Sequence, residues 1–158
     1  MEPHDDLTIK FTSGTTGLPK GCVRTHYGLT MGALSFLTEL PLEDEDVGLV
    51  SQTMAAGMAV YFLTIYIFKG VKSILLPRFE PGAYLDAVET ERVTHATAMD
   101  WMARRLVADP TFAKRDLSSL RILHGINVMA SLDGFLAQGT FKAGVSAGYA
   151  SSEAGGMV

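Results

Sequence analysis

The stretch from residue 47 to residue 68 contains no charged side chain, and it limits what this chain can fold into. Its length is in the range of a bilayer-spanning helix. Residues 51–53 (Ser-Gln-Thr) are polar, however, and Gly57 divides the stretch. We therefore interpret residues 47–51 as a buried strand and residues 58–68 as a buried helix, because covered parallel sheets produce long uncharged runs of this kind. The sequence predicts no membrane span.

The rest of the chain alternates short β-rich runs with helical periodicity. Strands are expected at residues 7–12, 22–25, 72–76, 94–98, 120–123 and 145–149. The run at 72–76 (Lys-Ser-Ile-Leu-Leu) has the pattern of a buried strand. Such alternation predicts an α/β fold with a mostly parallel sheet, helices on both faces and a glycine-rich hairpin at the start.

Apolar residues recur at helical spacing between these strands. The first helix is expected to end at Pro41 and to bury Leu29, Ala33, Phe36, Leu37 and Leu40. The second is expected to begin at Pro81 and to bury Leu85 and Val88, and the third to carry Trp101, Met102 and Leu106. The fourth, capped by Ser131, is expected to bury Leu132, Phe135 and Leu136. We assign the methionine and aromatic side chains at these positions to the core rather than to cofactor contacts.

Composition narrows the functional classes. The 158 residues are 47% apolar and 19% charged, which is typical of one folded domain. The net charge of -4 gives no reason to expect nucleic acid or an anionic membrane as a partner. Cys22 is the only cysteine, so an internal disulfide is excluded and a cytoplasmic location is expected. We interpret Cys22 as a small buried residue, and the acidic run at 43–46 as a solvated turn.

The densest chemical signal is the segment from Phe11 to Gly21, which combines glycines, hydroxyl side chains and a lysine. Glycines allow the backbone to turn with its N–H groups pointing inward, which makes a concave site for anions. Hydroxyl groups add short hydrogen-bond donors, and Lys20 adds a full positive charge. A polyphosphate requires this combination of many donors, little bulk and one cation.

Two alternatives were weighed for this segment. A mobile surface hairpin accounts for the glycines, but not for so many hydroxyl groups beside a lysine. A Walker P-loop requires a glycine immediately before the lysine and Ser or Thr after it. Here Pro19 precedes Lys20, which removes a backbone donor, and Gly21 follows it. The Walker alternative is therefore rejected.

The ten adjacent residues Thr12 to Gly21 (Thr-Ser-Gly-Thr-Thr-Gly-Leu-Pro-Lys-Gly) closely resemble the signature loop of the AMP-binding, adenylate-forming superfamily. That superfamily includes acyl-CoA synthetases, luciferases and peptide-synthetase adenylation domains. His26, at the expected start of a helix, is also similar to the family. The resemblance implies that the chain is part of the larger domain of such an enzyme. It implies nucleotide binding by Thr12, Ser13, Gly14, Thr15, Thr16, Gly17 and Lys20.

A second segment, Gly148 to Glu153, resembles the family's Tyr-Gly-x-Thr-Glu segment, with Ala150 in place of glycine and Ser152 in place of threonine. By that resemblance, Tyr149 packs near the adenine, Ser152 donates to the α-phosphate and Glu153 holds Mg²⁺. A carboxylate is a suitable hard ligand for a metal that bridges phosphates. Taken alone, Ser-Ser-Glu is more often a helix N-cap than a metal site.

Two more segments complete the resemblance. Gly125 lies where the family has a strand ending in a glycine pair beside the adenine, although Ile126 and Asn127 depart from that pattern. His124 is interpreted as a satisfied buried histidine. Residues 51–57 occupy the place of a family segment in which Met54 takes the position of a histidine. The implied pocket for the carboxylic acid is apolar and open, and includes Met54, Gly57, Gly125 and Ala150.

A nucleophile elbow, G-x-S-x-G, is matched by Gly144 to Gly148. A serine hydrolase of that fold needs an acid and then a histidine later in the chain, and no histidine or aspartate follows Ser146. The hydrolase hypothesis therefore fails for these residues, unless the chain is cut short before such partners.

The resemblance implies an acid–thiol ligase that uses ATP, Mg²⁺ and coenzyme A, with Lys20, Ser152 and Glu153 as catalytic residues. It covers residues 1–158 as a partial AMP-binding domain, with the phosphate loop at 11–21, an α/β layer at 26–158 and no C-terminal domain. We therefore expect the isolated chain to be incomplete and to self-associate through exposed surfaces. The alternative is a non-catalytic nucleotide-binding module or a truncated remnant. The sequence does not name the acid.

Overall fold

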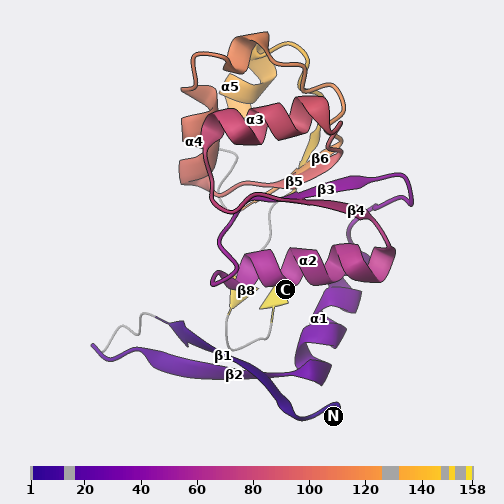
Figure 1. Cartoon of the computed structure of the whole chain (residues 1–158), viewed down its shortest axis with the longest axis vertical. Helices are drawn as coiled ribbons and strands as arrows, with labels where there is room; N and C mark the ends of the chain where they lie inside the picture. Colours follow the sequence, from indigo (N-terminus) through magenta and orange to yellow (C-terminus); the bar gives the residue numbers. More distant parts are fainter. Residues whose placement is uncertain (1, 13–16, 126–131, 147–149, 152–155, 158) are drawn as a thin grey trace.

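A five-stranded parallel sheet forms the centre of the protein (Figure 1). The computed structural model describes residues 2–12, 17–125, 132–146, 150–151 and 156–157. The sheet has the order β4-β3-β5-β6-β7, and every neighbouring pair is parallel. Its strands are β3 (Val47–Val50), β4 (Lys72–Leu75), β5 (His95–Thr97), β6 (Ile122–His124) and β7 (Gly144–Ser146). The predicted parallel sheet is confirmed.

Helices cover both faces of this sheet, as the sequence predicted (Figure 1). On one face lie α1 (His26–Leu37) and α2 (Gly57–Lys69), and on the other lie α3 (Pro81–Thr90), α4 (Asp100–Val107) and α5 (Leu132–Ala137), with the short 3-10 helix η1 (Phe112–Lys114). Each face has its own core: Phe62 and Ile65 of α2 lie in one, and Val88 and Leu106 lie in the other. None of the described helices is both long enough and apolar enough to cross a membrane.

An antiparallel hairpin precedes the sheet and lies at the lower end of the view in Figure 1. It consists of β1 (Asp6–Thr12) and β2 (Lys20–Thr25), close to the predicted strands. One face is apolar and exposed, with Ile9 opposite Val23. A further pair, β8 (Ala150–Ser151) and β9 (Gly156–Met157), was not predicted, because strands of two residues carry no hydrophobic pattern.

Local chemistry fixes the helix ends. Thr25 caps α1 by accepting a hydrogen bond from the Gly28 N–H at 3.1 Å, so His26 begins the helix as predicted. The helix ends at Leu37, before the end predicted at Pro41. Leu40 is buried in the turn that follows. Gly70 ends α2 with a φ of 74°, a left-handed conformation that favours glycine.

Several predicted core positions are wrong. β4 pairs only with β3 and is therefore an edge strand, so Leu75 is 53% exposed rather than buried. Trp101 and Leu136 lie on the outer faces of their helices, although Met102 and Phe135 are buried as expected. The Trp101 ring instead packs edge-on against the Phe79 ring. For Leu132, the structure describes only the backbone. Cys22 is only partly buried.

The acidic run at 43–46 is not entirely solvated, because Asp46 is only 4% exposed. Its carboxylate accepts hydrogen bonds from the Thr94 hydroxyl at 2.6 Å, the Glu43 N–H at 2.7 Å and the Arg121 guanidinium at 2.7 Å. Burial raises the pKa of Asp46, but these three donors together outweigh it, and the pKa lies below its ordinary value. Asp46 therefore ties the start of β3 to the residues before β5 and β6.

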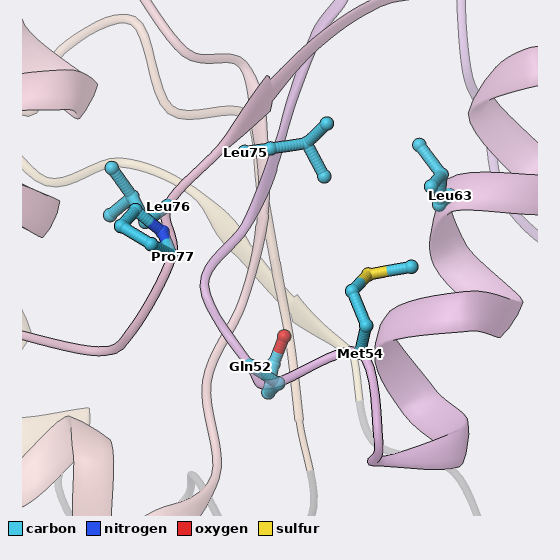
Figure 2. Close-up of a pocket in the computed structure, with 6 residues that line it drawn as sticks. All are labelled: Gln52, Met54, Leu63, Leu75, Leu76 and Pro77. Carbon is cyan, nitrogen blue, oxygen red and sulfur yellow. The ribbon is translucent and has the colours of Figure 1, made fainter.

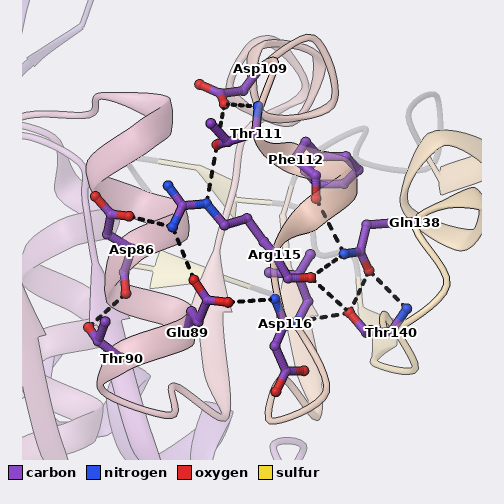
Figure 3. Close-up of polar contacts among 11 residues, drawn as sticks. Asp86, Glu89, Thr90, Asp109, Thr111, Phe112, Arg115, Asp116, Gln138 and Thr140 are labelled. Carbon is purple, nitrogen blue, oxygen red and sulfur yellow. Dashed lines mark hydrogen bonds and ion pairs between the residues drawn. The ribbon is translucent and has the colours of Figure 1, made fainter.

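A second polar cluster joins α3 to the segments around η1 and α5 (Figure 3). Arg115 forms ion pairs with Asp86 at 2.6 Å and Glu89 at 3.0 Å, and its Nε donates to the Thr111 hydroxyl at 3.2 Å. The Arg115 carbonyl accepts from the Thr140 hydroxyl at 3.2 Å. One residue thus connects three separate segments of the chain through its side chain and its backbone.

Replacing Arg115 by methionine should lower the melting temperature by about 4 to 8 °C, because several charge-assisted bonds are lost together. Differential scanning calorimetry measures this shift. Arg104→Met is the matched control, because its single pair with Asp100 is exposed and should contribute little. Equal melting temperatures for the two variants would show that the Arg115 cluster does not stabilise the fold.

Candidate active site

The candidate site lies at the edge of the sheet where the parallel strands have their carboxyl ends. From β3 the chain continues first to β4 on one side and then to β5 on the other, so the strand order reverses between β3 and β5. In open α/β sheets, ligands bind outside the carboxyl ends at such a switch point. Here the Thr97 hydroxyl, at the end of β5, donates to Gln52 Oε1, just after β3, at 2.9 Å. This hydrogen bond spans the switch point.

His124 and Gly125 lie at the same edge, at the end of β6, and both are buried. The His124 ring packs against Phe36 and Phe62, each with a centroid distance of 5.2 Å. Burial lowers the pKa of His124 to about 4, so the ring is neutral at neutral pH. The structure confirms the predicted buried histidine. Residues 126–127 lie outside the described part of the chain.

The neck of the glycine-rich hairpin is formed by Thr12 and Lys20, which face each other across the two strands. The Thr12 hydroxyl donates to the Lys20 carbonyl at 3.4 Å. Gly17 has a φ of 107°, a backbone conformation that side chains rarely adopt. Lys20 is exposed and takes part in none of the ion pairs among the described residues. Its charge is therefore available to an anion.

Lys10 of β1 lies against the first turn of α2. A Cβ atom added to Gly57 would lie 2.7 Å from Lys10 Nζ, so any larger residue would displace the end of the lysine side chain. The N-cap residue of α2, Ala56, offers no side-chain hydrogen bond to the helix. This contact places the predicted phosphate hairpin beside Gly57, a predicted pocket residue. Lys10 was not predicted as a site residue; its signal is a lysine within an otherwise apolar part of the strand.

A pocket of about 370 Å³ opens between the segment after β3, the edge strand β4 and helix α2 (Figure 2). Its described lining consists of Gln52, Met54, Leu63, Leu75, Leu76 and Pro77. Met54 lines this apolar and open pocket, and its predicted role in binding the carboxylic acid stays a prediction. Gln52 is the one polar side chain in this described lining, and it was not predicted. Gly57, Gly125 and Ala150 are not part of it.

The remaining predicted site residues lie outside the described part of the chain: Ser13, Gly14, Thr15, Thr16, Tyr149, Ser152 and Glu153. Ala150 is placed in β8, opposite Met157 of β9. Among the residues that the structure does describe, no group of three or more His, Cys, Asp or Glu side chains is arranged to hold a metal ion. The predicted magnesium ligand, Glu153, stays a prediction.

Comparison with known proteins identifies the family. Residues 1–158 match the family described as AMP-binding enzyme. This chain belongs to the AMP-binding enzymes. The chain is 39% identical over 121 residues to a feruloyl-CoA synthase from Amycolatopsis sp, covering 75% of this chain and 24% of that protein. It is 34% identical over 128 residues to 4-coumarate--CoA ligase 2 from Oryza sativa subsp. japonica, covering 78% of this chain and 22% of that protein.

Solved structures of AMP-binding enzymes show the same fold. The N-terminal domain of FACL13 from Mycobacterium tuberculosis, in an inhibitor-bound crystal structure, aligns with a TM-score of 0.86 and 28% identity, over 97% of this chain and 39% of that chain. The predicted fold class, part of the larger domain of an adenylate-forming enzyme, is therefore confirmed. The chain spans about a quarter of the length of the curated relatives it matches.

Proposed function

We propose that this chain supplies the nucleotide-binding and acid-binding surfaces of an acid–CoA ligase, which activates a carboxylic acid as an acyl-adenylate and transfers it to coenzyme A. One observation carries the proposal. Lys20, which has no ion-pair partner among the described residues, lies in the same hairpin as Lys10, whose side chain lies against the first turn of α2. Membership of the AMP-binding enzymes supports nucleotide binding at the hairpin.

The chemistry explains why such a site is needed. A carboxylate is a poor acyl donor, because its charge repels nucleophiles. In the proposed reaction, a carboxylate oxygen attacks the α-phosphorus of ATP and pyrophosphate leaves, which yields a mixed anhydride. The thiolate sulfur of coenzyme A then attacks the acyl carbon, and AMP leaves. Each step needs positioning and neutralisation of phosphate charge rather than a covalent group on the protein.

The residues take the following proposed roles. Thr12, Lys20 and the backbone between them hold the β- and γ-phosphates, and Ser152 donates to the α-phosphate. The hairpin neck fits an anion, because the Lys20 ammonium group has no carboxylate partner among the described residues. Glu153 would hold Mg²⁺, which supplies charge neutralisation between the phosphates.

The pocket supports an acid with an apolar body. Apart from Gln52, its described lining consists of aliphatic side chains and the thioether side chain of Met54. Its volume of about 370 Å³ lies within the usual range for small-molecule sites. Two relatives are named for feruloyl and 4-coumarate, both aromatic acids. We therefore propose an aryl-substituted acid as substrate. We also propose that the enzyme acts in the cytoplasm, which the single Cys22 supports.

Titration of the chain with ATP and Mg²⁺ tests the nucleotide site. Lys20→Ala should weaken ATP binding about 10- to 100-fold, because a charge-assisted bond to phosphate is lost. Glu153→Ala should weaken binding when Mg²⁺ is present and have little effect when EDTA has removed it. Lys142→Ala, which removes another exposed lysine, should change nothing.

The outcomes separate the alternatives. Binding that Lys142→Ala weakens as much as Lys20→Ala reflects general charge attraction and contradicts the proposed site. Failure of the parent chain to bind ATP supports a remnant without function. Intact ATP binding without exchange of pyrophosphate for any acid supports a non-catalytic nucleotide-binding module.

A further inference from the structure

We propose that Gln52 determines which acids the pocket accepts, by hydrogen-bonding a hydroxyl group on the apolar body of the substrate. The inference rests on the proposed function and names its substrate class more closely: an aryl acid that carries a ring hydroxyl. Gln52 lies at the switch point of the sheet and is the one polar side chain in the described lining of the pocket (Figure 2).

The position of Gln52 is fixed by its neighbours. The hydroxyl of Thr97, a fully buried residue, donates to Gln52 Oε1 at 2.9 Å. The Gln52 Nε2 lies 4.0 Å from the sulfur of Met58 and 3.9 Å from the sulfur of Met102. These two methionines belong to helices on opposite faces of the sheet, so their sulfur atoms flank the amide. A restrained polar group can recognise a ligand with little loss of conformational entropy.

The hydrogen-bonding capacity of this amide is only partly used. A side-chain carbonyl oxygen has two lone pairs, and Thr97 occupies one of them. Sulfur is a weak acceptor, so the Nε2 group retains most of its capacity to donate. A hydroxyl group can both accept from Nε2 and donate to Oε1. A ligand hydroxyl is therefore the simplest group that can hydrogen-bond to both the Nε2 donor and the remaining Oε1 lone pair.

The surrounding walls exclude other polar ligands. Leu63 lies in α2, Leu75 ends the edge strand β4, and Leu76 and Pro77 follow it (Figure 2). A charged group placed against these side chains would find no polar partner among them. Residues 54–57 connect this pocket to the first turn of α2, where Lys10 lies. The acid therefore has an apolar body at Gln52 and its carboxylate toward the hairpin.

Two acids that differ only in one hydroxyl group test the inference: 3-phenylpropenoic acid and its 4-hydroxy derivative. Isothermal titration calorimetry on the whole 158-residue chain should show that the 4-hydroxy acid binds about tenfold more tightly. In Gln52→Met, which keeps the length of the side chain but removes the amide, the two affinities should agree within twofold. The affinity for the acid without the hydroxyl should hardly change.

Leu75→Ala supplies a second variant that is expected to fold normally, since Leu75 is 53% exposed. It should weaken both acids by a similar factor and leave their ratio unchanged, because it trims an apolar wall only. The inference is overturned if the parent chain shows no preference, if it binds neither acid, if Gln52→Met keeps the preference, or if Leu75→Ala leaves both affinities unchanged. ATP titration of the same variants reports on the proposed function separately, because the hairpin is intact in all of them.

Discussion

Replacing Gly48 by alanine should destabilise the protein by at least about 3 kcal/mol, the largest effect we expect from a single methyl group in this chain. Gly48 lies in β3, and a Cβ atom there would approach two ring carbons of Tyr66 to 2.5 Å. The Tyr66 ring has little room to move, because it is fully buried, packs against Phe62 and bonds to His95 Nδ1 at 2.5 Å through its hydroxyl group. The strand or the helix must therefore shift.

Urea unfolding followed by circular dichroism measures this loss of stability. Gly82→Ala is the matched control: apart from its chain neighbours and the nearby helix backbone, no atom lies within 4 Å of the added methyl group, and the position is in α3. Alanine there should raise the free energy of unfolding slightly, because glycine is a poor helix former. In a Tyr66→Leu background, Gly48→Ala should cost less than about 1 kcal/mol, since the obstructing ring is gone. An equally large cost in that background would contradict the steric explanation.

Lowering the pH from 7 to 4.5 should reduce the free energy of unfolding by about 5 kcal/mol, about half from each of two buried histidines. Burial, together with the neighbouring His124, lowers the pKa of His95 to about 3, and burial lowers that of His124 to about 4, from ordinary values of 6.5. Both rings are therefore neutral in the folded protein while the unfolded chain takes up protons. Their contribution is complete above pH 6.5 and is lost as the pH falls toward 4 and then 3.

Thermal or urea unfolding at a series of pH values measures this slope. His124→Phe keeps a ring beside Phe36 and Phe62 but removes one titrating group, so the stability of this variant should depend less on pH between 6.5 and 4.5. His4→Gln is the control, because it removes an exposed histidine that lies outside both cores. Parallel pH profiles for the parent and His124→Phe would show that another group controls the acid sensitivity.

The pattern of charge and hydrophobicity was sufficient to predict the architecture. The uncharged stretch at 47–68 became β3 and α2, divided at the polar residues after Val50, because a strand and a helix that are both covered tolerate no charge. Thr25 and Gly70 fixed helix ends through local hydrogen bonds and backbone conformation, which nearby sequence determines. The phosphate hairpin was predicted from residue types alone.

What the sequence did not reveal depends on contacts between distant residues. Nothing near Leu75 shows that β4 lies at the sheet edge, because strand order is a property of the whole chain. Asp46 is buried by Arg121, which lies 75 positions later. Gln52 gained its place in the pocket from Thr97, 45 positions away, and a glutamine within an apolar segment gives no warning of such a partner. The edge position of β4, the buried pair of Asp46 and Arg121 and the place of Gln52 in the pocket all follow from the topology of the sheet.

One wall of the pocket is the outermost strand of the sheet, and this has a consequence for how the substrate range can evolve. Leu75 contributes little to either core, since more than half of its surface is already in water. Substitutions there alter the shape of the pocket proposed to bind the acid, at little cost in stability. Under the proposed function, natural variation at this edge strand can therefore change the fit of the acid's apolar body, while Gln52 keeps its own contact with the substrate and the protein continues to fold.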